Sequence, residues 1–527
     1  MSPAMLSTEN SAEPKVTLVN SFLQPFNNAV ATARTCYSSK VITTADVTKD
    51  EKAIALRDKI AESIYQAGHH TTLQHSTFQF ILEKVSRHFI WSFLHSHPFY
   101  NSEQVSQRYV EVKPGNFFAP PMSERAREIY IQTMDKQMEA YHKLIELLWP
   151  DAEKTYFGIF PARQKLADKW KGPIKKKVQE VARYVLPVST HAHLYHTISG
   201  ITLHRYNKLQ ESFDTPHEQK LVISKMIQAV NEIDPLFFKN IEDPIPLEQT
   251  LEYKLFDSFH KGNRDNFSSE FVREFDQSLG NNVSKLLDYK INAEATMAQA
   301  VRSVLGVANR ELDDTTAIRF VLDPSINPYY GESLNLTTLS KLARTMVHPH
   351  YTFRKKLSHT ADSQDQRHRM TPGSRPILFS HFQVDEPDYI TPPLIANNKE
   401  ANEYYKKTMG LVWQNINALL NLGVKPEFAM YMLPNAFPIR FEESGDLLSH
   451  HHKWTTRLCY TAQEEIWRMC LDEVKEVAKV HPRIAEYILP PCGLRARANT
   501  KPICPEGDRY CGIPVWKLDR SEFARKI

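Results

Sequence analysis

The sequence predicts two similar, helix-rich halves joined by a linker, and three observations support this. The chain has 527 residues, which is too long for one ordinary hydrophobic core and suits two large domains. A long amphipathic helix is predicted over 129–148 and another over 400–422, because apolar residues recur there at spacings of three and four. After each helix stands one pattern, E-x-A-x-Y-x-L-P. Its recurrence at matched places indicates an internal duplication.

The repeated pattern can be compared residue by residue. It reads EVARYVLP over 180–187 and EFAMYMLP over 427–434. Any helix that ends near a proline can look like this, but five matched positions after matched helices favour duplication. Shorter helices predicted around 31–34 and 298–302 occupy comparable places in the two halves.

Composition and charge exclude several classes of protein. With 42% hydrophobic and 24% charged residues the chain is an ordinary globular protein. Its formal net charge of +4 implies no strong field for nucleic acid or membrane. Residues 1–15 are polar and unlike a signal peptide, and charged residues interrupt the apolar stretch 78–99. Six cysteines make no disulfide framework in a chain of this length, so we expect a cytoplasmic protein.

Short polar motifs then point to a family. The second half carries Gln364 followed by the run Arg367-His368-Arg369, and the first half carries YNSEQVSQRY over 100–109. Upstream of that run stands GHHTTLQH over 68–75, followed by F-x-F. Together these resemble the flavin-dependent thymidylate synthases, whose motif has the form RHRxxSxNExSxRY. The resemblance implies an α+β fold in two tandem copies, each a mixed sheet flanked by long helices.

The two copies depart from the family pattern in complementary ways. Residues 94–96 read Leu-His-Ser where the family has RHR, and Gln210 stands where the second copy has Arg457. Conversely, Met430 stands where the first copy has Arg183. Family members are homotetramers with active sites at subunit interfaces. The resemblance therefore implies one composite site per pseudo-dimer, built from a half-site of each copy, and a homodimer that forms a pseudo-tetramer.

The resemblance also assigns the substrate contacts. A nucleotide monophosphate is a dianion, and arginine forks and serine hydroxyls suit its phosphate. The phosphate is expected to be bound by Ser106, Arg108 and Arg183. Glu103 is also expected to contact the substrate. Gln364 can donate to and accept from the pyrimidine edge. Arg457 is expected to stabilise negative charge on the ring and is counted, with His69, as catalytic.

Flavin adenine dinucleotide (FAD) is the implied cofactor. The residues expected to bind it are His69, Thr71, Gln74, Arg367, His368 and Arg369. The two arginines flank His368 on alternate sides, which suits an extended segment that grips a phosphate or the flavin edge. The implied reaction converts dUMP, methylenetetrahydrofolate and NADPH to dTMP and tetrahydrofolate. The flavin does the hydride chemistry, while the protein supplies position and charge.

Four segments are predicted along the chain. The first copy spans 14–230, a linker with a polar stretch at 261–269 spans 231–282, the second copy spans 283–481, and a tail rich in Cys, Arg and Pro spans 482–527.

Metal binding is not expected, although the sequence contains several groups of histidine or cysteine residues that could bind a metal. His69, His70 and His75 could form a metal cluster, but their motif favours the flavin. The run 450–452 (His-His-His) is expected to be an exposed polar turn rather than a metal site. Cys36 and Cys470 look like small core residues. The tail thiols Cys492, Cys504 and Cys511 lack the C-x-x-C pairs typical of zinc sites, so unpaired structural thiols are favoured over zinc with a fourth ligand from elsewhere.

Two other functions stay open at this point. The altered 94–96 segment is compatible with a flavin enzyme that acts on another pyrimidine nucleotide or a nucleic-acid base. A non-catalytic nucleotide-binding or scaffold protein is the other alternative, and a basic loop on the surface is the ordinary interpretation of Arg367-His368-Arg369 taken alone.

Overall fold

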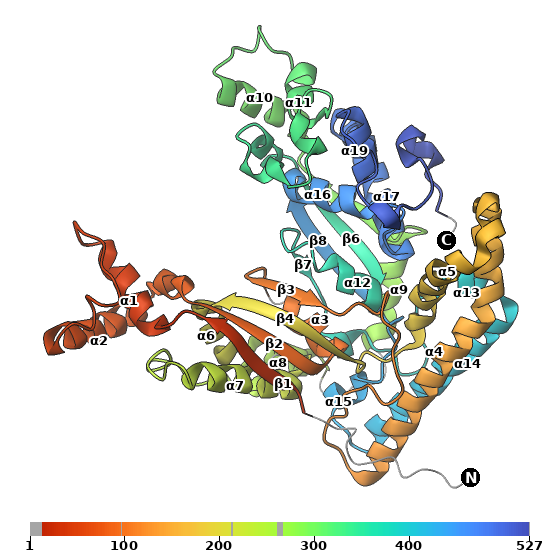
Figure 1. Cartoon of the computed structure of the whole chain (residues 1–527). Coiled ribbons are helices and arrows are strands. Elements are labelled where there is room, and N and C mark those ends of the chain that lie inside the picture. The colour runs from red at the N-terminus through yellow and green to blue at the C-terminus, as the bar shows by residue number, and fades with distance from the viewer. Residues whose placement is uncertain (1–12, 96, 212–213, 261–266, 526–527) are drawn as a thin grey trace. The chain divides into compact units, whose positions relative to one another are not determined.

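The computed structural model describes the chain except for residues 1–12, 96, 212–213, 261–266 and 526–527. Ser96 and the centre of the predicted linker therefore lie outside the described residues. The chain forms two compact units (Figure 1). Unit 1 comprises 1–139, 186–265 and 411–433, and unit 2 comprises 140–185, 266–410 and 434–527. Each unit is thus discontinuous in sequence.

Unit 1 is built around a four-stranded antiparallel sheet in the order β1-β2-β4-β3. Inward and outward side chains alternate along β2, as expected for a sheet with one buried face, and Phe78, Phe80 and Leu82 are fully buried. The strands are β1 (Lys15–Ser21), β2 (Thr77–Ser86), β3 (Tyr100–Gln104) and β4 (His191–Ser199). The helices are α1 (Pro25–Thr35), α2 (Glu51–Gln66), the 3₁₀ helix η2 (His70–His75), α3 (Arg87–His95), α6 (Gly200–Lys208), α7 (Pro216–Asn231), α8 (Leu251–His260) and α15 (Pro426–Met430).

Unit 2 repeats this plan with the strand order β5-β6-β8-β7. Every strand pair is again antiparallel, where a mixed sheet was expected; the α+β prediction itself is confirmed. The strands are β5 (Ser284–Tyr289), β6 (His350–Ser358), β7 (Gly373–Ser374) and β8 (Pro438–Asp446). The helices include α5 (Ala167–Ala182), η4 (Arg183–Val185), α9 (Phe267–Leu279), α10 (Ala293–Leu305), α11 (Asp314–Leu322), α12 (His359–Asp365), α13 (Pro393–Ala396), α16 (Leu447–Arg457), α17 (Glu464–Val480), α18 (Pro482–Ala485) and α19 (Pro491–Arg497).

The two predicted long helices are present as α4 (Glu124–Ile159) and α14 (Lys399–Asn421). The boundary between the units falls inside both of them. As a result, each unit contains the sheet of one copy and most of the E-x-A-x-Y-x-L-P segment of the other, namely 427–433 in unit 1 and 180–185 in unit 2. Matching backbone bonds hold these segments: Ser189 N–H donates to Tyr431 O at 3.1 Å in unit 1, and Ala436 N–H donates to Tyr184 O at 2.9 Å in unit 2.

The range predicted as a linker contains regular structure, namely α8 and α9. Helix α9 contributes Asp276, which accepts from Arg440 of β8 at 2.8 Å, so this helix is packed into unit 2. Among the described residues, no helix is long and apolar enough to span a membrane.

Candidate functional site

Helices α12 and α16 bring three of the predicted site residues together in unit 2. Each helix has a polar N-cap, because Ser358 accepts from Ala361 N–H and Asp446 accepts from Ser449 N–H. Arg457 is the last residue of α16, and its Nε donates to His368 Nε2 at 2.9 Å while its Nη2 donates to Gln364 O at 3.0 Å. The structure therefore joins Gln364, His368 and Arg457 in one hydrogen-bonded constellation.

The constellation requires His368 to be neutral at Nε2. Burial, followed by the nearby charges of Arg457 and Lys453, holds the pKa of His368 well below its usual value. A neutral imidazole nitrogen can accept from a guanidinium that is always protonated. Beside it, Gln364 Nε2 is buried with no hydrogen-bond partner among the described residues. An unpaired buried donor is costly, so this amide is suited to a ligand oxygen.

A buried ionic cluster underlies the constellation. Lys355 of β6 lies 2.6 Å from Glu443, 2.8 Å from Glu473 and 3.5 Å from Asp365. Lys453 of α16 pairs with Asp365 at 2.7 Å and also with Glu443. All five side chains are fully buried. Because the cluster links both helices to the sheet, it fixes the positions of Gln364 and Arg457.

The charges in this cluster respond differently to burial. Although burial opposes it, the two lysines hold the pKa of Asp365 well below its usual value. Burial raises the pKa of Glu443 to about 7. Arg375 joins the cluster through Asp362 at 2.9 Å and is only 8% exposed. Arg375 is therefore held in the interior of unit 2.

Arg367 and Arg369 lie in a turn, so the predicted extended segment is wrong. The turn follows α12, and Arg367 N–H donates to Gln364 O at 3.3 Å while His368 N–H donates to Asp365 O at 3.0 Å. These bonds satisfy the last carbonyls of the helix, a requirement that the alternating charges did not reveal. Arg367 is exposed and Arg369 is half-buried.

Arg183, the predicted phosphate ligand, lies in η4 of unit 2 and is 3% exposed. Its Nε donates to Glu180 O at 3.2 Å, and its own carbonyl accepts from Asn435 Nδ2 at 3.0 Å. The position is thus a fixed corner between α5 and the segment that leads into β8.

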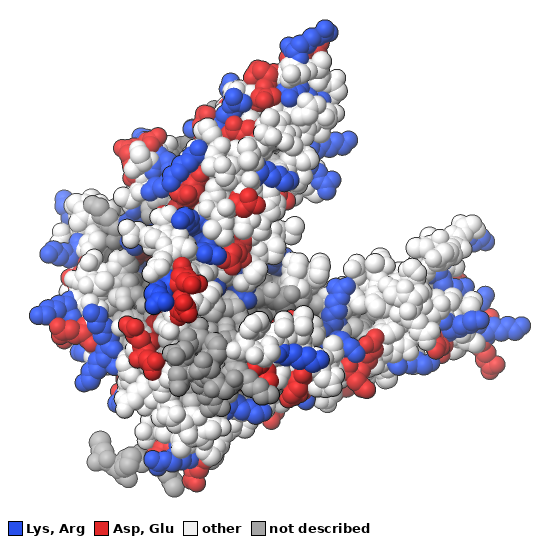
Figure 2. Space-filling model, turned by 180° about the vertical axis from the view of Figure 1, so that it is seen from behind, with Lys and Arg blue, Asp and Glu red and all other residues white. Residues whose placement is uncertain are grey.

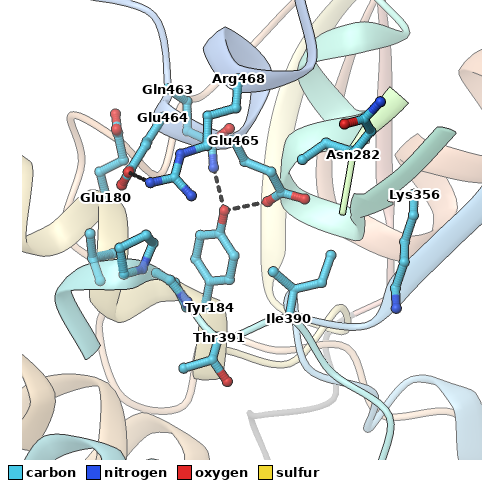
Figure 3. Close-up of a pocket in the computed structure, with 14 residues that line it drawn as sticks. Glu180, Tyr184, Asn282, Lys356, Ile390, Thr391, Gln463, Glu464, Glu465 and Arg468 are labelled. Carbon is cyan, nitrogen blue, oxygen red and sulfur yellow. Dashed lines mark hydrogen bonds and ion pairs between the residues drawn. The ribbon is translucent and has the colours of Figure 1, made fainter. Parts of the chain in front are cut away.

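Tyr184, the next residue, occupies a buried polar network that the sequence analysis missed (Figure 3). Its hydroxyl donates to Glu465 Oε2 at 2.5 Å and accepts from Gln463 Nε2. Glu465 also accepts from Ser358 N and Oγ, both at 2.6 Å. Burial raises the pKa of Glu465. The signal that could have found this network is the tyrosine shared by the two signature segments.

A cavity of about 200 Å³ opens beside Tyr184 in unit 2 (Figure 3). Its lining combines acidic, basic and apolar side chains, and includes neither Gln364 nor Arg457. The polar members labelled in the figure are Glu180, Tyr184, Asn282, Lys356, Thr391, Gln463, Glu464, Glu465 and Arg468.

Unit 1 contains an equivalent of the Tyr184 network. Tyr431 donates to Glu218 Oε2 at 2.8 Å, and Glu218 accepts from Ser86 Oγ at 2.6 Å and Ser86 N at 2.7 Å. Burial raises the pKa of Glu218 to about 7. The same three residue types with the same bonds, in sheets of the same strand order, show that the two halves are structural repeats.

The predicted flavin residues of the first copy cluster around η2 in unit 1. His69 precedes this helix, and Thr71 and Gln74 lie within it; all three are exposed. The helix packs closely on α6, since Gly200 N–H donates to Ser76 O at 2.7 Å. A side chain at Gly200 would meet Leu73 O at 2.9 Å, so the contact requires glycine.

The predicted phosphate residues of the first copy lie at the opposite end of the same sheet. Glu103 is exposed on β3, and Arg108 N–H donates to Ser106 Oγ at 3.3 Å just after that strand. The start of β2 pairs at Ser199 of β4, whereas the end of β3 pairs at Leu194. Five residues of strand correspond to about 17 Å. Unit 1 alone therefore does not bring its two groups of predicted residues together.

Positive and negative side chains are interspersed over the face of the molecule shown in Figure 2. This agrees with the small net charge of +4.

Two predictions about minor clusters are wrong. Cys36 is exposed, because it caps α1 at the protein surface, whereas Cys470 is buried as expected. The histidine run 450–452 lies inside α16 rather than in an exposed turn. His450 is fully buried and stacks on Trp454 with ring centroids 4.8 Å apart, as residues four apart on a helix can. No three His, Cys, Asp or Glu side chains of the described residues form a ready-made metal site.

Comparisons with known proteins agree with this architecture. The family described as "Thymidylate synthase complementing protein" (Thy1) matches residues 17–236 and again 285–483. The chain belongs to this family and contains its domain twice. The duplication predicted from the sequence is thereby confirmed.

Several relatives are named flavin-dependent thymidylate synthases. The protein from Clostridium tetani is 25% identical over 43% of this chain and 85% of its own length. The one from Sulfurisphaera tokodaii is 34% identical over 28% of this chain and 57% of its own length. The one from Geobacter sulfurreducens is 27% identical over 43% of this chain and 92% of its own length. Each relative therefore corresponds to less than half of this chain.

Among solved structures, the UMP/dUMP methylase PolB from Streptomyces cacaoi, bound with 5-Br dUMP, matches with a TM-score of 0.31 and 18% identity. The match covers 43% of this chain and 94% of that chain.

Proposed function

We propose that this protein converts dUMP to dTMP, using methylenetetrahydrofolate as the one-carbon donor, NADPH as the reductant and FAD as the cofactor. The observation that carries the proposal is the constellation of Gln364, His368 and Arg457. Arg457 is oriented by His368 and by the Gln364 carbonyl, and Gln364 Nε2 is a buried donor that has no partner within the part of the chain that the structure describes. A pyrimidine carbonyl would complete this arrangement.

The chemistry of the constellation suits a uracil ring. Gln364 would donate to a ring carbonyl, and its own side-chain oxygen could accept the ring N–H. Arg457 would stabilise negative charge that develops on the ring as C5 attacks. A well-placed donor of this kind contributes about 3–4 kcal/mol to the transition state. His368 acts here through Arg457, by holding the guanidinium in place as a neutral acceptor.

The phosphate would be bound by Ser106, Arg108 and Arg183, with Glu103 beside them on β3. Because unit 1 alone separates its predicted phosphate and flavin residues, the proposal includes a composite site to which both copies contribute. It also includes the pairing of two chains into a pseudo-tetramer, measurable as a dimer mass by light scattering.

The polar groups present fit FAD as the resident cofactor. Thr71 and Gln74 are exposed on the 3₁₀ helix η2, His69 is exposed just before it, and Arg367 is an exposed cation in a tight turn. These residues, with Arg369, would hold the flavin and its pyrophosphate. When bound, FAD supplies the hydride-transfer chemistry.

The test has two stages. The purified full chain is examined for a flavin absorption spectrum and for the mass of the extracted cofactor, and then assayed for product formation with dUMP, UMP and dCMP. We expect bound FAD and dTMP formation from dUMP. Gln364→Ala should abolish most of the activity, whereas Gln132→Ala, a change of an exposed glutamine on α4, should leave it intact.

The same experiment distinguishes the alternatives. Flavin binding with turnover of only UMP or dCMP would show a changed substrate. The altered residues 94–96 of the first copy motivate this alternative, and His95 among them packs against Trp91 with ring centroids 4.7 Å apart. Absence of flavin and of all turnover would show a non-catalytic protein and overturn the proposal.

A further inference from the structure

Four of the six cysteines line one small cavity in unit 2, although they are far apart in the sequence. The cavity has a volume of about 10 Å³, the size of a single atom or water molecule. Cys459 reaches it from the turn between α16 and α17, and Cys492 from the first turn of α19. Cys504 and Cys511 reach it from the C-terminal segment.

These four thiols are close enough to affect one another. Burial, and then the proximity of the other three thiols, raises the pKa of Cys492 to about 12. Burial also raises the pKa values of Cys459 and Cys511. All four cysteines are free thiols, so the structure contains no disulfide that would explain why they meet.

The surrounding segment has little regular structure to hold it. Between the end of α19 and residue 525, the described chain has only three short 3₁₀ helices: η10 (Gly507–Arg509), η11 (Val515–Lys517) and η12 (Arg520–Glu522). A metal ion can stabilise a short stretch of chain that has little regular structure of its own. Four thiols around an atom-sized cavity are the ligand set of a structural zinc site.

We propose that Cys459, Cys492, Cys504 and Cys511 bind one zinc ion, which fastens the C-terminal segment to the turn between α16 and α17. In the structure these side chains do not yet form a ready-made metal site. All four already line the same cavity, and the sulfur of a cysteine changes its direction by rotation about a single bond between backbone and sulfur. Binding releases the thiol protons, since the thiolate is the ligand.

The site is distinct from the proposed nucleotide site but adjoins it in sequence. Cys459 lies two residues after Arg457, and Leu458 between them accepts from Trp467 Nε1 at 3.1 Å. The zinc would therefore stabilise the turn that ends the arginine-bearing helix. The proposal of a zinc site itself does not depend on the proposed function, because its readout is metal content.

The test measures zinc, iron and sulfide in the full chain purified under reducing conditions without added metal. We expect about one zinc ion per chain. Single Cys→Ser changes at 459, 492, 504 and 511 should each lower the zinc content strongly. Cys36→Ser, at an exposed thiol of unit 1, and Cys470→Ser, at a buried thiol outside the cavity, should not.

A second measurement needs no variant and covers the case in which the substituted chains fail to fold. The metal of the parent chain is removed with a chelator and replaced with Co²⁺. We expect the intense near-ultraviolet charge-transfer bands of a tetrathiolate, together with slower proteolysis of the segment after α19 than in the metal-depleted chain. A chain without metal that gives no such bands with Co²⁺, or one that contains iron and sulfide in place of zinc, would overturn the proposal.

Discussion

Arg457 and His368 are joined by a hydrogen bond of 2.9 Å, in which the guanidinium Nε donates to the imidazole Nε2. One residue ends α16 and the other follows α12, so this bond fixes the orientation of two helix ends relative to each other. The histidine is thus a neutral acceptor that orients the positively charged guanidinium of Arg457. Both the activity and the pH dependence of stability should depend on this bond.

Replacing Arg457 with lysine should lower the rate of dTMP formation by about 10²–10³-fold, because the compact ammonium cannot reproduce both bonds and still face the ring. The measurement is kcat with dUMP. Arg310→Lys, at a site where the side chain is 85% exposed, is the matched control. An unchanged kcat in Arg457→Lys would contradict the assigned pyrimidine contact.

His368→Gln should reduce the loss of stability on acidification. The folded state holds the pKa of His368 well below 6.5, so as pH falls through about 6.5 the unfolded chain takes up a proton that the folded chain does not. Stability therefore decreases toward acid pH, and glutamine removes this contribution while keeping an acceptor oxygen. The thermal unfolding midpoints of parent and variant are measured at pH 7 and pH 5. An equal decrease of the midpoint in both proteins would contradict the predicted role of His368.

Glu218→Gln should become favourable relative to the parent as pH rises. Burial raises the pKa of Glu218 to about 7 from an ordinary value of 4.5, so the folded protein binds a proton that the unfolded chain has lost in that interval. Stability falls as pH rises through it, by roughly 3 kcal/mol in total.

Glutamine does not ionise, so the stability of Glu218→Gln lacks this pH dependence. The difference in unfolding free energy between variant and parent should therefore change by roughly 3 kcal/mol between pH 4 and pH 8. Denaturant unfolding at the two pH values gives the measurement, with Glu128→Gln on the surface of α4 as the control. Glu465→Gln in the equivalent network of unit 2 should shift in the same direction.

Arg183→Met should raise KM for the nucleotide with little effect on folding. The second copy carries Met430 at the same position of the repeated signature and buries it to 1% exposure, so the local fold accepts methionine. Loss of a charged hydrogen bond to phosphate costs about 1.5–3 kcal/mol, or roughly 10–100-fold in affinity. Isothermal titration with dUMP measures this, and Arg125→Met on the exposed face of α4 is the control; equal affinities would remove Arg183 from the site.

Lys355→Met should destabilise unit 2 by about 3–5 kcal/mol, because it leaves Glu443, Glu473 and Asp365 buried with one cation fewer. Lys285→Met, at an exposed lysine of the neighbouring strand β5, should have little effect. The unfolding midpoints of the two variants in urea are compared. Similar midpoints would show that the ionic cluster rearranges after loss of Lys355 without loss of stability.

Much of the architecture could be predicted from local patterns. The long helices α4 and α14 follow from apolar spacing, and the duplication follows from a signature that lies after each of them. The pairs Tyr184–Glu465 and Tyr431–Glu218 could not be predicted from local patterns, since a hydrogen bond between residues more than 200 positions apart leaves no periodic signal in the sequence. The histidines of α16 were misjudged for a similar reason, because their burial depends on Trp454 and on the sheet beneath.

Local patterns in the sequence were enough to show that there are two copies, where their two long helices lie and which polar residues each copy has kept, because periodicity and motif spacing are local properties of the chain. Three relationships became visible only in the folded chain: each compact unit takes most of its signature segment from the other copy, Arg457 is held by His368, and Cys459 meets Cys492, Cys504 and Cys511. Those relationships arise from packing between distant segments, where burial and the pairing of polar groups select one arrangement from many that the same local patterns allow.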